Sequence, residues 1–259
     1  MTAKILMFDI ETAPMKADVW GMWKQNVGLN QLNSDWYVLC WAAKWLGEDE
    51  VFYSSLNDTE GYEPYSEDDE ALITPLWELL DQADVVIGHN GRRFDVPKMN
   101  ARFIKYGMPP PSTFKVVDTL DIAKRQFKFS SNRLDYLGQF LGVGGKMPHQ
   151  GHGLWTGCIE GDKACWKTMI EYNIRDIALL EDVYLKLRPW APTHPNMALW
   201  MEDDGEMKCP KCGSTKHKKK GFAYTSVGKY QRHVCHDCGG NFRDRVNTYN
   251  RKGMGVNAL

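Results

Sequence analysis

The chain of 259 residues is long enough for one domain of ordinary size and a small second one, and too short for several large domains. Hydrophobic residues make up 43% of the chain and charged residues 25%, which excludes wholesale disorder. No apolar run approaches the roughly 18 residues that a membrane span needs. Asp9 and Glu11 interrupt the first apolar segment before a signal peptide can develop. We therefore expect a cytoplasmic protein with no membrane partner.

The net charge of −1 hides two parts of opposite sign. Residues 208–259 contain 8 Lys and 4 Arg against 2 Asp, which gives +10, whereas residues 1–207 carry 20 basic and 31 acidic residues, which gives −11. This asymmetry predicts a basic C-terminal part that binds a polyanion. The acidic part would repel the same polyanion unless it binds cations.

Hydrophobic patterns in the first 188 residues predict an α/β domain. The nearly unbroken apolar run of residues 4–10 is typical of a strand buried on both faces. Residues 36–46 and 51–54 predict a hairpin that extends the same sheet. The remaining patterns predict short strands at 84–88 and 114–117 and helices at 69–81, 96–106, 134–141 and 162–187. Alternating strands and helices of this kind indicate a mixed sheet flanked by helices.

A boundary follows the last predicted helix. Pro189, Pro192 and Pro195 each remove a backbone donor and cannot continue a helix. An acidic stretch at residues 202–206 comes next. We therefore expect a domain over residues 1–188, a proline-rich and acidic linker over 189–207, and a small domain over 208–259.

Three segments carry acidic residues where folding alone would favour other types. Asp9 and Glu11 share one face of the first strand because side chains alternate along a strand. Asp95 stands between a strand and a helix, and Tyr172 and Asp176 are stacked four residues apart on the last helix. Taken singly, each segment has a simpler interpretation: a solvated strand end, a helix cap, and a solvated helix edge. Carboxylates that crowd together repel one another unless cations such as Mg²⁺ or Mn²⁺ compensate them.

The three segments together resemble a known family. Phe8-Asp9-Ile10-Glu11-Thr12, then Asn90 to Asp95, then Tyr172-x-x-x-Asp176 are similar in order and separation to the motifs of the DEDD exonucleases, which have a ribonuclease H-like fold. The tyrosine four residues before the last aspartate places the chain with the tyrosine branch, DEDDy. The resemblance implies that Asp9, Glu11, Asp95 and Asp176 hold two Mg²⁺ or Mn²⁺ ions. It also implies the release of nucleoside 5′-monophosphates from 3′ ends.

This chemistry suits the residue types. Two divalent ions about 3.5 to 4 Å apart activate a water and stabilise charge on the phosphate and on the leaving oxygen. Tyr172, with a reference pKa of about 10, is a poor general base near neutrality, so we assign it to orienting the attacking water. Asn90 and Phe94 are candidates for holding the terminal nucleotide, the latter by stacking, and a place in the core is the alternative for Phe94. Further candidates are Asp118 as a support or cap and Lys146 as a phosphate contact. His149 and His152 are expected in a mobile loop that covers the site or, as the alternative, in an unstructured surface loop. Cys40, Cys158 and Cys165 are interpreted as core or bystander residues.

Four further cysteines form two Cys-x-x-Cys pairs. They are Cys209, Cys212, Cys235 and Cys238, each pair followed by a glycine. Four thiolates match tetrahedral Zn²⁺, and a tail with little apolar content needs such a metal to fold. We therefore expect one structural Zn²⁺ in a zinc ribbon. Replacement of a cysteine by His217, His233 or His236, or an iron–sulfur cluster in place of zinc, are the alternatives.

Cations alternate with aromatic residues on the arm between the cysteine pairs and beyond it. This pattern suits phosphate contact combined with base stacking, without sequence readout. The alternatives are a merely solvated arm or a ribbon that binds protein. The residues that we expect to contact nucleic acid here are Lys218, Lys219, Lys220, Arg232 and Arg243.

The sequence thus predicts a metal-dependent 3′–5′ exodeoxyribonuclease that acts on single-stranded or frayed 3′ ends and is anchored by a zinc ribbon. DNA is favoured over RNA because nothing in the sequence senses a 2′-hydroxyl. A separate DNA polymerase or replication protein is a candidate partner, in replication or repair. The alternatives are a structure-specific endonuclease on the same scaffold and a non-catalytic DNA-binding accessory protein.

Overall fold

The computed structural model describes residues 2–147 and 150–249. The chain divides into two compact units, one of residues 4–121 and 129–183, the other of the described residues among 1–3, 122–128 and 184–259. We call them the sheet unit and the cysteine unit, and each is described by itself. No helix among the described residues is both long enough and apolar enough to cross a bilayer.

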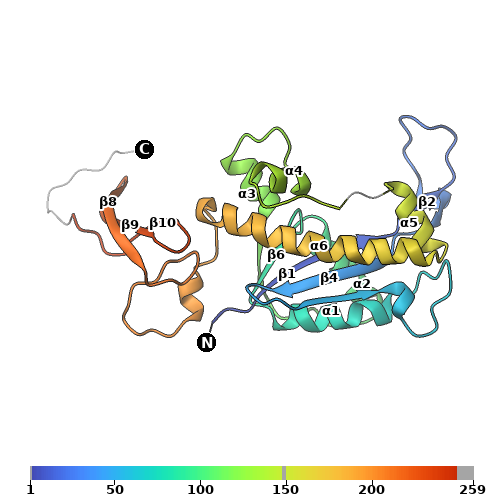
Figure 1. Ribbon diagram of the computed structural model, residues 1–259, viewed down its shortest axis with the longest axis horizontal. Coiled ribbons are helices and arrows are strands. Elements are labelled where there is room, and N and C mark those ends of the chain that lie inside the picture. The colour runs from blue at the N-terminus through green and yellow to red at the C-terminus, as the bar shows by residue number, and fades with distance from the viewer. Residues whose placement is uncertain (1, 148–149, 250–259) are drawn as a thin grey trace. The chain divides into compact units, whose positions relative to one another are not determined.

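A five-stranded mixed sheet forms the centre of the sheet unit, in the order β5-β4-β1-β6-β7 (Figure 1). β1 pairs antiparallel with β4 and parallel with β6, β5 extends the antiparallel side, and β7 extends the parallel side. The strands are β1 (Ile5–Thr12), β4 (Val38–Trp45), β5 (Val51–Ser55), β6 (Val85–Gly88) and β7 (Lys115–Asp118). The expected mixed α/β fold is therefore confirmed.

Helices α1 (Glu70–Gln82) and α6 (Lys163–Leu187) cover opposite faces of this sheet (Figure 1). On β4, the indole of Trp41 donates to the carbonyl of Leu72 on α1. Lys44, which points to the other face because side chains alternate, pairs with Glu181 on α6. The strand is buried on both sides, which explains its continuous apolar run.

A buried aspartate joins the helices on the α1 face to the sheet. Asp69, just before α1, accepts a hydrogen bond from the backbone of Val38 at 2.8 Å and pairs with Arg102 of α2 (Asp95–Lys105). The hydroxyl of Tyr106 donates to the same carboxylate at 2.8 Å. α1 runs through Pro75, although proline removes one helical hydrogen bond, because a row of buried side chains anchors it: Leu72, Ile73, Leu76 and Leu80.

Every strand and helix named in the sequence analysis of this unit is present, with ends within two residues of the expectation. The elements that the sequence did not predict are short. They are β2 (Lys16–Ala17), β3 (Leu32–Ser34), α3 (Thr119–Gln126) and α5 (His152–Ile159), besides single 3₁₀ turns. α4 (Leu134–Phe140) matches its predicted position.

The cysteine unit contains a three-stranded antiparallel sheet in the order β10-β9-β8. β8 (His217–Thr225) and β9 (Gly228–Cys235) form a hairpin between the two cysteine pairs, and β10 (Asn241–Arg243) follows the second pair. The register of β8 shifts between Lys219 and Phe222, where Gly221 takes a left-handed φ of 65°. The hairpin of β8 and β9 thus accounts for the long stretch of chain between Cys212 and Cys235.

Candidate active site

β1 directs Asp9 and Glu11 to the face of the sheet that α6 covers. Their partners across the strand pair are Ala42 and Cys40, which are small. Cys40 Sγ approaches the amide oxygen of Asn173 on α6, at 3.9 Å. The alternate residues Leu6, Phe8 and Ile10 point to the opposite face and join the core. The two carboxylates therefore share a space bounded by α6.

Asp95 reaches the same region from the parallel side of the sheet. The pairing of β6 with β1 ends at Met7, and the free backbone N–H of Ile10 further along donates to Asp95 Oδ1 at 3.2 Å. The chain turns sharply to bring Asp95 there, since a Cβ on Gly88 would lie only 3.0 Å from the Cα of Gly91. Asp95 is the first residue of α2, where a negative charge meets the positive end of the helix dipole.

Asp118 supports this turn, as the weaker sequence candidate suggested. Its carboxylate accepts backbone hydrogen bonds from Asn90 at 2.9 Å and Arg92 at 3.2 Å, and from Leu120 at 3.0 Å at the start of α3. Asn90 has a left-handed φ of 71° and is partly buried. Phe94 is 38% exposed and lies under the ammonium of Lys98, with Nζ 4.9 Å from the ring centroid, so it is a surface residue and no part of the core.

The last helix contributes Tyr172 and Asp176, both buried. Lys146 joins them: its ammonium donates to the Tyr172 hydroxyl at 2.6 Å and forms an ion pair with Asp176. Lys146 was a candidate for a phosphate contact, but it instead pairs with a carboxylate of the cluster. Asn173, which the sequence analysis left out, donates to Asp9 Oδ2 at 2.9 Å and holds that carboxylate against α6.

Carboxylate oxygens of Asp9, Glu11 and Asp176 lie within 4.8 Å of one another. Asp95 stands outside that limit but is close enough for its charge to act on Asp9. Three oxygen donors at this separation suit hard divalent cations such as Mg²⁺ or Mn²⁺. The arrangement therefore fits the metal ions that the sequence predicts.

Burial and mutual repulsion disfavour the ionised forms of these acids. Burial, and then the charges of Asp95, Glu11 and Asp176, raise the pKa of Asp9 well above its usual value. Burial raises the pKa of Glu11 to about 8 and that of Asp95 to about 7. Among the described residues, Lys146 is the cation that offsets the charge of Glu11, and a hydrogen bond with Trp155 also lowers the pKa of Glu11. A buried carboxylate cluster with so little compensation favours binding of additional positive charge.

The pKa values of Tyr172 and Lys146 move in the same direction. Burial and the charge of Asp176 raise the pKa of Tyr172, so its hydroxyl stays protonated at neutral pH. For Lys146, burial alone lowers the pKa, but the charge of Asp176 and the hydrogen bonds to Asp176 and Tyr172 outweigh that effect and raise it. The ammonium of Lys146 and the neutral hydroxyl of Tyr172 thus lie side by side in the site.

A cavity of about 350 Å³ adjoins the carboxylates at the end of β1. Thr12 to Met15 line it on one side and Trp36, Lys98, His152 and Trp155 on the other. His152 is the first residue of α5, so the expectation of a surface loop was wrong for it. Two glycines, Gly153 and Gly157, make the segment look like a loop in sequence, although Leu154, Cys158 and Ile159 are buried and anchor it as a helix. His149 lies outside the described residues.

The three remaining cysteines are not members of the carboxylate cluster found among the described residues, although Cys40 lies beside Glu11. Cys40 and Cys158 are buried, and Cys165 is partly buried. Burial raises the pKa of each thiol, which agrees with a structural interpretation.

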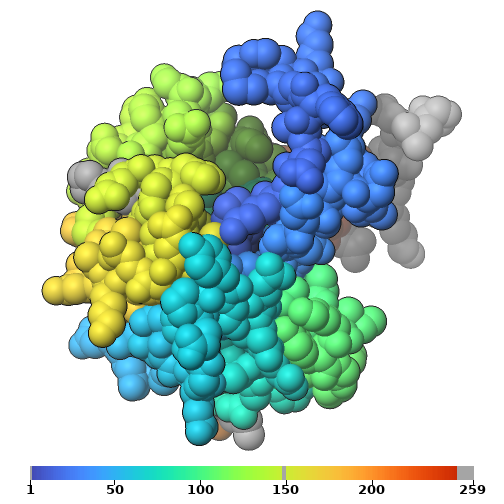
Figure 2. Space-filling model, turned by 90° about the vertical axis from the view of Figure 1, so that its right-hand side faces the viewer, coloured from blue at the N-terminus to red at the C-terminus, as the bar shows by residue number. Residues whose placement is uncertain are grey.

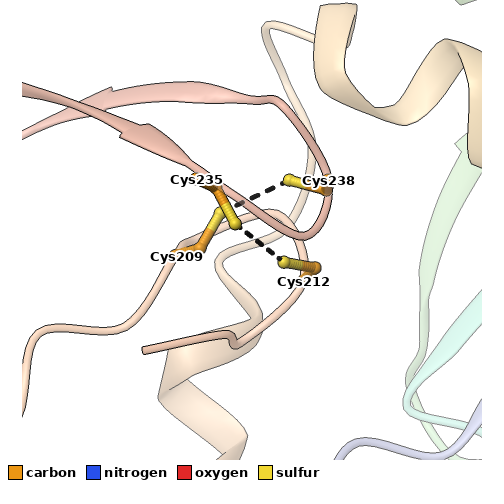
Figure 3. Close-up of side chains that lie close together, drawn as sticks. All are labelled: Cys209, Cys212, Cys235 and Cys238. Carbon is orange, nitrogen blue, oxygen red and sulfur yellow. Dashed lines mark hydrogen bonds between the residues drawn. The ribbon is translucent and has the colours of Figure 1, made fainter. Parts of the chain in front are cut away.

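The cysteine unit contains a second cluster. Cys209, Cys212, Cys235 and Cys238 bring their sulfurs within 4.8 Å of one another (Figure 3). Cys209 Sγ lies 3.7 Å from Cys238 Sγ, and Cys212 Sγ lies 3.6 Å from Cys235 Sγ. In tetrahedral coordination with Zn–S bonds of about 2.3 Å, sulfurs are about 3.8 Å apart. The cluster fits a zinc ribbon.

The turns of the two pairs explain their glycines. Gly213 and Gly239 have left-handed φ angles of 78° and 75°, and each donates to the carbonyl of the first cysteine of its pair. The histidines considered as substitutes lie elsewhere: His217 and His233 contact each other at 3.1 Å, and His233 pairs with Asp244 at 2.7 Å. Among the described residues, the group here that could hold a metal ion therefore consists of the four thiols.

The expected basic arm lies largely on the surface of the ribbon. Lys218, Lys219, Lys220 and Arg243 are exposed, and Arg232 is partly buried with its Nε donating to the carbonyl of Lys220 at 2.8 Å. Arg243 stacks over the ring of Tyr230 at 3.9 Å, and Lys229 over that of Phe222 at 4.0 Å. A cavity of about 530 Å³ near the first of these pairs is lined by Lys211, Arg243 and Arg245, among others.

Comparison with known proteins places the fold. A family model described as RNase_H superfamily matches residues 51–188, which include Asp95, Tyr172 and Asp176. Among solved structures, the family B DNA polymerase from the hyperthermophilic archaeon Pyrobaculum calidifontis is similar, with a TM-score of 0.53 and 17% identity over 73% of this chain. The chain spans 25% of that polymerase's length. A search of curated proteins finds no match.

Proposed function

Because the chain belongs to the RNase_H superfamily, we propose that it is a metal-dependent nuclease, a 3′–5′ exonuclease of the DEDD tyrosine branch that acts on DNA. The observation that carries the proposal is the convergence of Asp9 and Glu11, which are partly buried, with the buried Asp176 within 4.8 Å. Membership in the superfamily supports the nuclease class. The direction, the subtype and the preference for DNA are inferred from the motifs and from the site.

Asp9, Glu11, Asp95 and Asp176 are the residues that would hold two divalent cations. When bound, such ions act as Lewis acids that lower the pKa of the attacking water and stabilise charge on the phosphate. Asn173 keeps Asp9 oriented through its 2.9 Å hydrogen bond. The contact of Ile10 with Asp95 fixes the second carboxylate in the same way.

Tyr172 orients the water that attacks the phosphodiester. Its hydroxyl lies 2.6 Å from Lys146 Nζ and, with a raised pKa, acts as a hydrogen-bonding group rather than as a base. Lys146 holds Tyr172 and Asp176 together. Its ammonium also supplies positive charge near the position of the anionic substrate.

The cavity beside Thr12 supports a site for the end of a strand. It lies where β1 ends, directly after Glu11, and combines an ammonium, that of Lys98, with the rings of Trp36 and Trp155. An aromatic surface next to a cation suits a terminal nucleotide, since a base stacks and a phosphate pairs. We assign Phe94, beside Lys98, to the same task, and Asn90 to a polar contact with the nucleotide.

The cysteine cluster would hold one structural Zn²⁺. The exposed arm of the ribbon would then bind the phosphate backbone without reading sequence, through Lys218, Lys219, Lys220, Arg232 and Arg243. We propose that the zinc ribbon, residues 208–259, anchors the nuclease domain of residues 1–188 to DNA.

The test is hydrolysis of 5′-labelled single-stranded DNA, duplex DNA, RNA and closed circular DNA with Mg²⁺, Mn²⁺ or EDTA. We expect mononucleotide release from linear 3′ ends, no cleavage of closed circles, and no activity in EDTA. Asp9→Asn should lower the rate by at least about a thousandfold while the circular dichroism spectrum stays native. Cutting of closed circles would favour an endonuclease, and an Asp9→Asn protein with wild-type turnover would falsify the assignment.

A further inference from the structure

An apolar loop stands exposed on the sheet unit. Residues 18–31 join β2 to β3, and we call this segment the tryptophan loop. Trp20 is 97% exposed and Trp23 81%, and neither has a ring partner among the described residues. The other exposed apolar side chains of the loop are Val19, Met22, Val27 and Leu29. Soluble proteins rarely expose so many large apolar side chains in one place unless the surface binds something.

Strand pairing and hydrogen bonds at the base of the loop fix the direction in which it leaves the sheet unit. β2 and β3 pair through Lys16 with Ser34 and Ala17 with Leu32. Gln31 donates from Nε2 to the carbonyl of Asp18 at 2.8 Å and accepts the backbone N–H of Gly28 at 2.9 Å. The backbone N–H of Asp18 donates to Gln31 at 3.0 Å. With its backbone polar groups satisfied at the base, the tip projects without packing against the core.

The loop continues directly from the carboxylate site. Glu11 lies near the end of β1, residues 13–15 line the 350 Å³ cavity, and β2 starts at Lys16. Figure 2 shows the blue N-terminal segment projecting at the top of this face, beside a hollow that the yellow residues around α5 border on the other side. A strand that leaves the cavity on this side therefore meets the loop next.

The loop itself carries a small positive charge. Lys16 and Lys24 outnumber Asp18 within residues 15–31, which leaves a net charge of +1. Lys98 adds a cation in the cavity, with Nζ 3.8 Å from the centroid of the Trp36 ring. Aromatic rings interleaved with cations are suited to bases and phosphates of an unpaired strand.

We propose that Trp20 and Trp23 form a stacking platform for unpaired nucleobases upstream of the 3′ end, an inference that rests on the proposed nuclease function. Indole rings exposed to this degree offer both faces to a base, and stacking does not depend on base identity. Bases inside a duplex are already stacked on their neighbours and have no face to offer. The platform therefore selects single-stranded or frayed ends over blunt duplex ends.

The test compares two substrates on the full-length protein with Mn²⁺. One is a single-stranded oligodeoxynucleotide, which is long enough to reach the loop, and the other is the p-nitrophenyl ester of thymidine 5′-monophosphate, which is not. In the double variant Trp20→Ala/Trp23→Ala, we expect the ratio of kcat/KM for the oligonucleotide to kcat/KM for the ester to fall about tenfold or more. Tyr53→Ala is the matched control, since this exposed aromatic lies on β5, two strands from β1, and its ratio should equal that of the wild type.

An unchanged ratio in the double variant would overturn the platform, whether the two kcat/KM values stay at the wild-type level or fall equally. Binding to anionic lipid vesicles or self-association that depends on the two tryptophans, with the ratio unchanged, would assign the loop to another partner. If the wild type hydrolyses neither substrate, the proposed nuclease function fails. In that case, quenching of tryptophan fluorescence by the oligonucleotide in EDTA still tests the platform. We expect less quenching in the double variant than in the wild type, and equal quenching would refute stacking.

Discussion

Lys146 and Asp176 form an ion pair inside the candidate active site, and the Asp176 side chain is only 2% exposed. The ammonium of Lys146 thereby occupies one side of the carboxylate cluster that fits divalent cations. A positive charge at this position has two opposite effects. It lowers the repulsion among the acids in the absence of metal, and it competes with a metal ion for an oxygen of Asp176.

Replacing Lys146 should therefore separate metal binding from turnover. Two unit charges 4 Å apart interact by about 1 kcal/mol even in bulk water, so we expect Lys146→Met to bind Mn²⁺ about fivefold more tightly. Hydrolysis should nevertheless fall by about a hundredfold, because Tyr172 and Asp176 lose the group that positions them. Calorimetric titration with Mn²⁺ and single-turnover rates measure the two effects.

The control is Lys44→Met, which removes another partly buried lysine, the partner of Glu181 on the same helix. It should lower stability without changing affinity for Mn²⁺. Weaker metal binding by Lys146→Met would contradict the competition, and unchanged turnover would show that the lysine positions nothing.

Tyr172→Phe tests whether the hydroxyl orients water. Loss of one hydrogen bond to a charged or reacting group typically costs 1.5 to 3 kcal/mol, so the rate should fall about tenfold to a hundredfold, less than after loss of a carboxylate. Because the pKa of Tyr172 is raised by burial, the pH dependence of the rate should keep its wild-type shape. Tyr62→Phe, which removes a hydroxyl that donates to the Cys158 carbonyl at 3.3 Å, is the control and should be fully active. If Tyr172→Phe instead loses one of the pH-dependent parts of the wild-type rate profile, Tyr172 acts as a general base.

Stability of the metal-free protein should fall as pH rises. Glu11 has a pKa of about 8 and Asp95 of about 7 in the folded chain, against about 4.3 and 3.9 when unfolded. Between the unfolded and the folded pKa values, the folded state binds more protons than the unfolded state. The free energy of unfolding therefore decreases progressively from about pH 4 to about pH 8. Burial is the main cause of both shifts.

We expect the Tm in EDTA to decrease from pH 5 to pH 8, and Glu11→Gln to flatten this decrease. Each kcal/mol corresponds to about 2 to 4 °C for a domain of this size, so the variant should exceed the wild type by several degrees at the higher pH. Adding Mn²⁺ should raise the wild-type Tm more at pH 8 than at pH 5. The exposed Glu78→Gln is the control, and a wild-type Tm that is independent of pH in EDTA would contradict the raised pKa values.

The sequence predicted the central elements because burial leaves a periodic pattern. β1 and β4 appear as continuous apolar runs since both of their faces are covered, and α6 repeats its apolar residues at helical spacing. The approach of Asp9, Glu11 and Asp176 was also expected from three motifs. The resemblance of these motifs to those of the DEDD exonucleases implied the grouping, and in the structure it arises because α6 lies over β1.

Other features depend on contacts that no local pattern encodes. Lys146 meets Asp176 across 30 residues of chain, and Asn173 reaches Asp9 from the far end of the sheet unit's sequence. The apolar residues from Val19 to Leu29 look like a core segment in sequence, yet they are exposed in the structure. Burial of such a segment depends on whether another element covers it, and here none among the described residues does.

The folded ribbon of the cysteine unit should require bound zinc. Metal binding must remove protons from four thiols, and the pKa values of Cys212 and Cys238 are raised, the former first by a hydrogen bond with Cys209 and the latter by burial. We expect one Zn²⁺ per purified chain by elemental analysis, and close to none in Cys209→Ser. Ester hydrolysis should persist in this variant because the carboxylates lie in the sheet unit. Cys165→Ser, outside the cluster, should keep its zinc; if it also loses the metal, or if the wild type carries iron, the zinc assignment is wrong.

The lysines of the ribbon's arm should bind the phosphate backbone of DNA. Each phosphate contact with a single strand contributes about 0.7 to the slope of log K against log salt concentration, so replacing Lys218, Lys219 and Lys220 by Gln should lower that slope by about 2 if all three contact phosphates. The loss of affinity should be the same for different base sequences, since phosphates carry no sequence information. The control replaces three exposed lysines of α6 by Gln, at positions 163, 167 and 186, and should leave the slope unchanged. Fluorescence anisotropy over a salt series in EDTA measures the slopes of both triple variants. Equal slopes would show that the arm does not bind nucleic acid through these lysines.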